Sequence, residues 1–150
     1  MNKIMSTLIT LLAFGLFSCT KPPQGLVSFY YGTQGTAYNS GYKYEVTLKD
    51  NHAEIVMKEE YDSETEITIV CEDSKILEEL QQIATHHKMY RYKGYYKSKF
   101  EIMDGETWYI TLKYSDGTMV HASGHHAWPR GFGDALDEVR RCIMKYKDNN

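Results

Sequence analysis

The stretch that decides the fold is Tyr42-Lys43-Tyr44-Glu45-Val46-Thr47-Leu48-Lys49-Asp50-Asn51-His52-Ala53-Glu54-Ile55-Val56-Met57. Apolar and polar side chains alternate along both halves, the period of two of a strand with one buried face. Asp50-Asn51 can make a two-residue turn, which would pair Leu48 with Ala53, Val46 with Ile55 and Tyr44 with Met57. The sequence therefore predicts a hairpin whose inward partners are all apolar.

A second hairpin is predicted near the C-terminus. Trp108, Ile110, Leu112 and Tyr114 alternate with their neighbours, and Ser115-Asp116-Gly117 follows as a turn. A two-residue turn would set Leu112 opposite His121, whereas a bulged turn with Gly117 left-handed sets it opposite Val120. We predict the bulged turn. The run 65–71 predicts a further strand, and 26–31 is a weaker candidate.

Two amphipathic helices complete the pattern. Ile76, Leu77, Leu80, Ile83 and Ala84 recur at helical spacing after a possible cap at Asp73 or Ser74. A final helix over 132–147 has its own apolar stripe: Phe132, Leu136, Val139, Ile143 and Tyr146. Two apolar stripes need a sheet face to cover. The predicted fold is α+β, an antiparallel sheet of about five to seven strands with two helices on one face.

The N-terminus reads as an export signal. Lys3 precedes an uncharged run, 4–17, that is shorter than the ~20 residues of a spanning helix. Leu16-Phe17-Ser18-Cys19 resembles the lipobox of bacterial lipoprotein precursors, which implies a signal peptide at 1–18 and acyl chains such as palmitate on Cys19. A proline-containing tether at 19–25 would then join the membrane to one domain at 26–150. Ordinary secretion and uncleaved anchoring are the alternatives, because Phe17 stands where the lipobox prefers a smaller residue.

The same resemblance bears on location. Thr20 follows the cysteine where inner-membrane lipoproteins have aspartate, which favours the outer membrane of the cell envelope. Without residues 1–18, the 132 remaining residues hold 16 basic and 20 acidic side chains. An exported, acidic chain of this kind argues against a nucleic-acid partner. We expect the membrane, through lipid, and a glycan or an envelope protein as partners.

Cysteine and histidine leave two questions open. Cys71 and Cys142 either form a disulfide or remain two buried thiols. His121, His125 and His126 are close in sequence, but no paired ligands stand at zinc spacing, so we predict no metal and no cofactor. Catalytic residues are not predicted either, since no nucleophile elbow is present.

The segment 88–100 interleaves lysines and arginine with tyrosines and contains no acid. Such a basic aromatic surface suits a glycan, an anionic headgroup or a protein. The candidate contacts are Tyr92, Lys93, Tyr95, Tyr96 and Lys97, with Trp128 nearby. Alternatively, Tyr90, Tyr92 and Phe100 fill the edge of the core while the lysines face solvent.

The final third, from Asp104 to Phe132, contains Ser123-Gly124-His125-His126-Ala127-Trp128-Pro129-Arg130-Gly131-Phe132. It resembles a family of uncharacterised bacterial envelope lipoproteins, to which no activity attaches. We expect 124–132 to be a structural joint, with Gly124 and Gly131 in special conformations and Trp128 buried as its anchor. The predicted function is a non-enzymatic binding module; the alternative is a small hydrolase or a metal-dependent enzyme.

Overall fold

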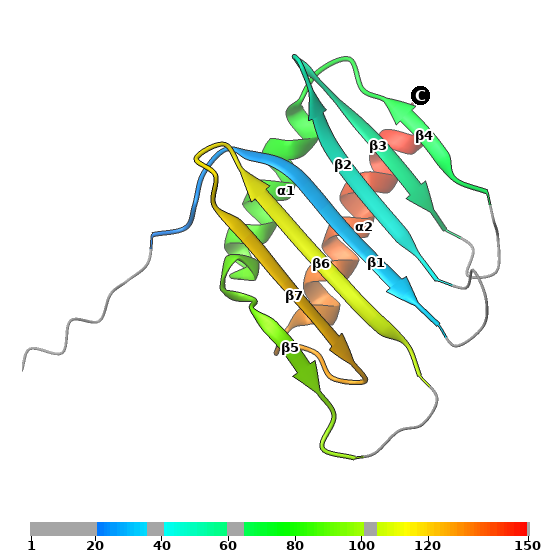
Figure 1. Cartoon of the computed structure of the whole chain (residues 1–150). Coiled ribbons are helices and arrows are strands. Elements are labelled where there is room, and N and C mark those ends of the chain that lie inside the picture. The colour runs from blue at the N-terminus through cyan, green and yellow to red at the C-terminus, as the bar shows by residue number, and fades with distance from the viewer. Residues whose placement is uncertain (1–20, 36–40, 60–64, 101–104, 150) are drawn as a thin grey trace, which may run out of the picture.

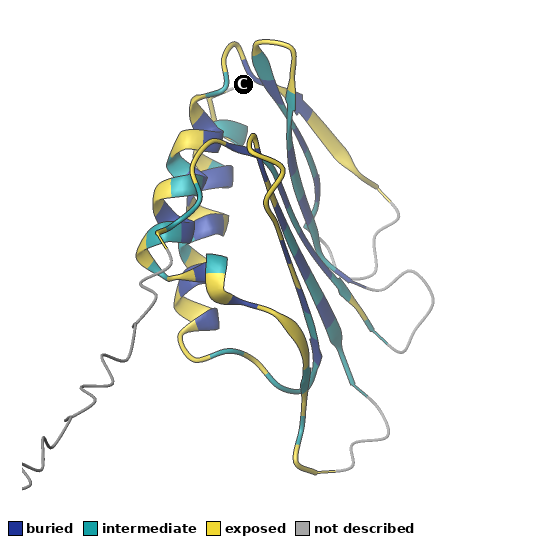
Figure 2. Cartoon of the chain, turned by 60° about the vertical axis from the view of Figure 1, so that its left-hand side comes forward, coloured by how far each residue is buried: buried dark blue, intermediate teal, exposed yellow. Residues whose placement is uncertain are grey.

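A computed structural model describes residues 21–35, 41–59, 65–100 and 105–149. Seven strands form one sheet in the order β4-β3-β2-β1-β6-β7-β5. Two helices, α1 (Lys75–His86) and α2 (Phe132–Lys147), lie side by side on one face of this sheet and run across its strands (Figure 1). No helix of the described residues lies on the other face (Figure 2). The predicted α+β fold is confirmed.

The alternation of apolar and polar side chains sets the register of both predicted hairpins. β2 (Lys43–Lys49) and β3 (His52–Lys58) pair with Leu48 opposite Ala53 and Val46 opposite Ile55. β6 (Thr107–Tyr114) and β7 (Met119–His125) pair with Leu112 opposite Val120. Gly117 has a φ of 85°, so the bulged turn is confirmed as well.

The strand predicted over 65–71 and the weaker candidate at 26–31 are both found. β1 (Leu26–Gln34) lies at the centre, between β2 and β6, and β4 (Ile67–Val70) forms one edge. The opposite edge, β5 (Gly94–Lys97), was not expected as a strand, and it pairs with β7 in parallel. The sheet is therefore mostly, but not entirely, antiparallel.

The core lies between the helices and the inward face of the sheet. α1 buries the five residues predicted for it, and Asp73 Oδ1 accepts a hydrogen bond from the Lys75 backbone N–H (2.8 Å) at its start. α2 buries Phe132, Ala135, Val139, Cys142 and Ile143, with Leu136 and Tyr146 only partly buried. All the buried hydrophobic residues fall between Leu26 and Ile143, so the described domain holds its own core.

The end of the predicted tether, residues 23–25, is held by hydrogen bonds to the domain. The side-chain amide of Gln81 on α1 donates to the Pro23 carbonyl (2.7 Å), and Ser115 N donates to the Gly25 carbonyl (2.7 Å). Residues 23–25 are thus fixed beside α1 and the β6–β7 turn. Among the described residues, no helix is long and apolar enough to cross a membrane.

Candidate functional site

The tyrosine-rich segment 88–100 divides into two parts. A short 3-10 helix, η1 (Met89–Arg91), follows α1 and buries Met89. Gly94, with a φ of 71°, then turns the chain into β5, which forms the edge of the sheet beside β7. A positive φ is readily adopted by glycine, so this residue allows the change of direction.

Two tyrosines of this segment belong to the core. Tyr92 is only 7% exposed and its ring lies 6.0 Å from that of Phe132, while the ring of Tyr96 lies 5.7 Å from that of Trp108. Burial, and then the neighbouring Tyr96, raises the pKa of Tyr92. These two rings support the sheet edge, since Tyr92 is almost wholly buried and Tyr96 is half-buried. Their predicted contact with a ligand stays a prediction.

Other side chains of the segment face solvent. Tyr95 is 60% exposed and Phe100 is 80% exposed, so the alternative that Phe100 fills the core edge is wrong. Lys93 and Lys97 are exposed. Because β5 pairs with no strand but β7 among the described residues, its outer edge there offers unpaired backbone N–H and C=O groups beside Tyr95.

The loop after β7 has a different anchor from the predicted one. Trp128 is 48% exposed, so its predicted burial is wrong. The buried tryptophan is Trp108 on β6, whose indole Nε1 donates to the Ala127 carbonyl (2.8 Å) and whose ring lies 4.6 Å from Phe132. Gly131 is left-handed (φ 75°) as expected. Gly124 has a different role from Gly131: it leaves space for the ring of Trp108, because a Cβ at position 124 would lie 2.6 Å from Trp108 Nε1.

Ring contacts connect this loop to β5. Lys97 is the register partner of His125, whose ring lies 5.0 Å from that of His126. The ring of His126 lies 6.2 Å from that of Trp128. Tyr95, Lys97 and Trp128 therefore belong to one end of β5 and β7, which we call the β5 end.

The three histidines do not converge. His121 and His125 lie on the open face of β7, where Nδ1 of each is hydrogen-bonded to a threonine of β6, Thr111 (3.0 Å) and Thr107 (3.1 Å). Four residues of strand separate them by about 13 Å. His126, with a φ of 47°, turns away and buries Nε2 without a partner. Within the described ranges, no three His, Cys, Asp or Glu side chains are grouped to hold a metal.

The two cysteines are separate buried thiols, which contradicts the disulfide alternative. Cys71 follows β4, whereas Cys142 on α2 points at α1, with Sγ 3.7 Å from Glu79 Oε2. Burial raises the pKa of both, that of Cys142 to about 12 with the Glu79 carboxylate beside it. A thiol that stays protonated is a poor nucleophile.

Glu79 is the polar centre between the two helices. Its carboxylate accepts hydrogen bonds from Lys145 Nζ (3.1 Å) and Tyr146 Oη (3.0 Å) on α2. It also lines a cavity of about 370 Å³ with Cys71. Burial alone would raise the pKa of Glu79, but these hydrogen bonds outweigh it and hold the pKa below its ordinary value. Its two carboxylate oxygens are engaged in joining the helices.

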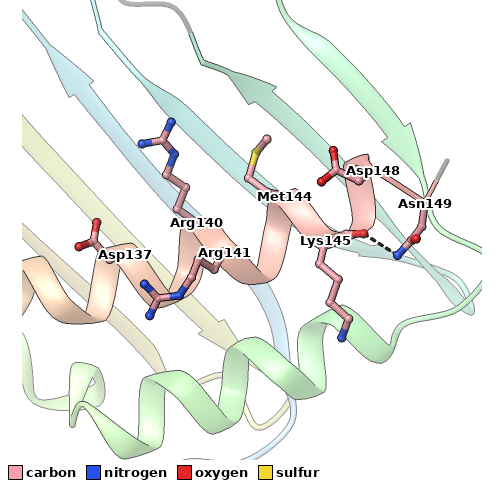
Figure 3. Close-up of a pocket in the computed structure, with 7 residues that line it drawn as sticks. All are labelled: Asp137, Arg140, Arg141, Met144, Lys145, Asp148 and Asn149. Atoms are coloured by element: carbon pink, nitrogen blue, oxygen red, sulfur yellow. Dashed lines mark hydrogen bonds between the residues drawn. The ribbon is translucent and has the colours of Figure 1, made fainter.

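A depression of about 670 Å³ follows the outer side of α2. Figure 3 shows that Arg140 and Arg141 point in different directions and that Lys145 extends toward α1. The one hydrogen bond drawn there joins the Asn149 side chain to the Lys145 carbonyl (2.7 Å). Side chains that diverge in this way do not form a binding site with convergent polar groups.

A groove of about 890 Å³ lies where the chain enters the domain. Lys21 and Pro23 of the tether line it together with 90–93 and with the first strand residues of β7. Opposite them lies Asp116, whose pKa is held down by the Thr118 backbone N–H (2.8 Å). We call this feature the tether groove. Sequence reasoning missed it, because nothing local links Lys21 to residues seventy positions later.

Comparisons with protein-family models, with characterised proteins and with solved structures give no match.

Proposed function

We propose that the protein is a lipid-anchored lipoprotein of the bacterial cell envelope, and that its domain is a non-enzymatic recognition module. Export and acylation are argued from Lys3, the apolar run and the lipobox-like Cys19. The fixed contacts of Pro23 and Gly25 support a short connection between the anchor and the domain.

The observation that carries the recognition function is the exposed aromatic surface of the β5 end. Tyr95 is 60% exposed and Trp128 is 48% exposed, and both are among the few large apolar side chains of the described residues that face solvent. Tyrosine and tryptophan are enriched in binding interfaces because each combines a large apolar ring with one polar group. Lys97 beside them adds positive charge.

The free edge of β5 favours an extended peptide segment of an envelope protein as the ligand. Such a segment can add to the sheet through main-chain hydrogen bonds, with side chains such as Tyr95 providing specificity. A glycan is the second candidate, favoured by the exposed rings of Tyr95 and Trp128, on which a sugar can stack.

Two measurements test this proposal. Cys19→Ala should abolish incorporation of labelled palmitate and release the protein from membranes; unlabelled wild-type protein would reject the lipid anchor. Cross-linking and glycan arrays should give hits with wild type that Tyr95→Ala and Trp128→Ala lose. Val70→Ala is the matched control, since Val70 is 58% exposed on the opposite edge strand. Hits that all three variants retain would reject the β5 end as the site.

A further inference from the structure

The tether groove concentrates positive charge in an acidic chain. Lys21, Arg91 and Lys93 line it and are exposed, and none has an ion-pair partner among the residues that the structure describes. Asp116 is the one carboxylate in the lining, which leaves a local excess of positive charge. The Arg91 guanidinium also lies 5.6 Å from the centre of the Tyr90 ring, so its donors remain available.

The length of the tether limits the distance between this groove and the bilayer. Lys21 stands two residues after Cys19, and two extended residues span at most about 7 Å. Acyl chains on Cys19 would therefore hold Lys21, and the groove it lines, at the surface of the bilayer. Because Pro23 and Gly25 are bound to α1 and to the β6–β7 turn, the domain has little freedom to rotate away.

We propose that the tether groove binds the phosphate groups of anionic phospholipids in the bilayer that holds the anchor, and that this contact orients the domain. The inference rests on the lipid anchoring proposed above. Lys21, Arg91 and Lys93 supply the phosphate contacts, since basic side chains near an anionic bilayer are attracted to its surface. Tyr90 and the exposed Met119 place apolar surface at the level of the headgroups.

This orientation has a functional consequence. β7 runs from Met119 at the groove to His125 at the β5 end, and seven strand residues cover about 20 Å. The strand therefore separates the bilayer contact from Lys97, the register partner of His125, and from Trp128, while Tyr95, opposite Ser123, lies part of the way along. With the groove on the membrane, the β5 end is directed away from it, where a ligand in the envelope can reach it.

Vesicle flotation tests the contact without the anchor. A chain of residues 20–150 lacks Cys19 but keeps the complete core. It should float with vesicles of phosphatidylcholine and phosphatidylglycerol, and much less with phosphatidylcholine alone or in high salt. Arg91→Glu with Lys93→Glu should weaken binding roughly twentyfold or more, at about fivefold for each lost basic charge. Lys97→Glu with Lys99→Glu, the same charge change at the β5 end, should bind nearly as well as wild type.

Equal binding to both kinds of vesicle, or equal losses in the two double variants, would overturn the proposal. The result is independent of acylation, because the chain that is tested carries no lipid. A failure of palmitate labelling at Cys19 would thus reject the anchor alone, whereas a failure of flotation with labelling intact would reject the groove alone.

Tryptophan fluorescence tests the orientation in the acylated protein. In vesicles with brominated acyl chains, Trp128 should not be quenched, because it lies at the β5 end. Tyr90→Trp should add an emission that these lipids quench. Quenching of wild type, or an unquenched Tyr90→Trp variant, would contradict the orientation.

Discussion

The indole Nε1 of Trp108 donates a hydrogen bond to the carbonyl oxygen of Ala127 over 2.8 Å, which ties the loop before α2 to the start of β6. Trp108 is fully buried, whereas Trp128 in the loop itself is half exposed. The structural joint expected around Trp128 therefore exists, but Trp108 of β6 holds it in place and Trp128 does not.

Replacing the two tryptophans should separate these roles. Trp108→Ala removes a fully buried ring and its hydrogen bond, so it should lower the free energy of unfolding by about 3–5 kcal/mol. Trp128→Ala removes a ring that is already half in water, and should cost less than about 1 kcal/mol. Urea unfolding of both variants measures the difference. Equal losses would contradict the assigned roles.

Gly124 should not tolerate a side chain. A Cβ at this position would lie 2.5 Å from the Ala127 carbonyl oxygen and 2.6 Å from Trp108 Nε1, so Gly124→Ala must displace the loop or the ring. We expect a loss of about 1–3 kcal/mol in unfolding free energy. Gly133→Ala is the control, since nothing lies within 4 Å of a Cβ there and alanine favours the helix. It should be neutral or stabilise by up to about 1 kcal/mol.

The hairpins could be predicted because their pairing is local. A shift of one residue would turn Val46 or Leu112 toward solvent, so alternation and turn length fix the register. β5 could not be predicted in this way, since its partner β7 follows much later in the chain and pairs in parallel. For the same reason the sequence did not distinguish Tyr92 and Tyr96, which pack inward, from Tyr95. Their directions depend on a strand that no short-range pattern indicates.

Glu79 should make stability depend on pH in the acid range. Its folded-state pKa lies below the ordinary value, near 4.3 for an unfolded chain, because Lys145 and Tyr146 donate to it. Its contribution is therefore complete above that pH and is lost as the pH falls through the lower folded value. Glu79→Gln should be less stable than wild type by about 1 kcal/mol at pH 7, a modest figure because the pair is partly exposed.

This gap in unfolding free energy between Glu79→Gln and wild type should narrow as the pH falls below about 4.3 and through the lower folded-state pKa of Glu79. Thermal unfolding from pH 3 to pH 7 measures it. Glu78→Gln is the matched control, since Glu78 is exposed on the same helix and loses the same charge. A gap of constant size for Glu79→Gln would show that its carboxylate is not engaged by α2.

The cysteines give the last prediction. Both thiols are buried and free. Burial raises the pKa of each, that of Cys142 to about 12, so both stay protonated near neutral pH. Native protein should therefore react very slowly with a thiol reagent such as iodoacetamide, because the thiolate is the reactive form and the reagent cannot reach it.

Unfolding in urea without reductant should expose two reactive thiols, Cys71 and Cys142, when residue 19 is absent. Slow reaction in the native state alone does not separate buried thiols from a disulfide, so the unfolded, unreduced sample decides. Two labelled cysteines by mass spectrometry are the expected result. Labelling that appears only after a reductant is added would show that the two residues are bridged.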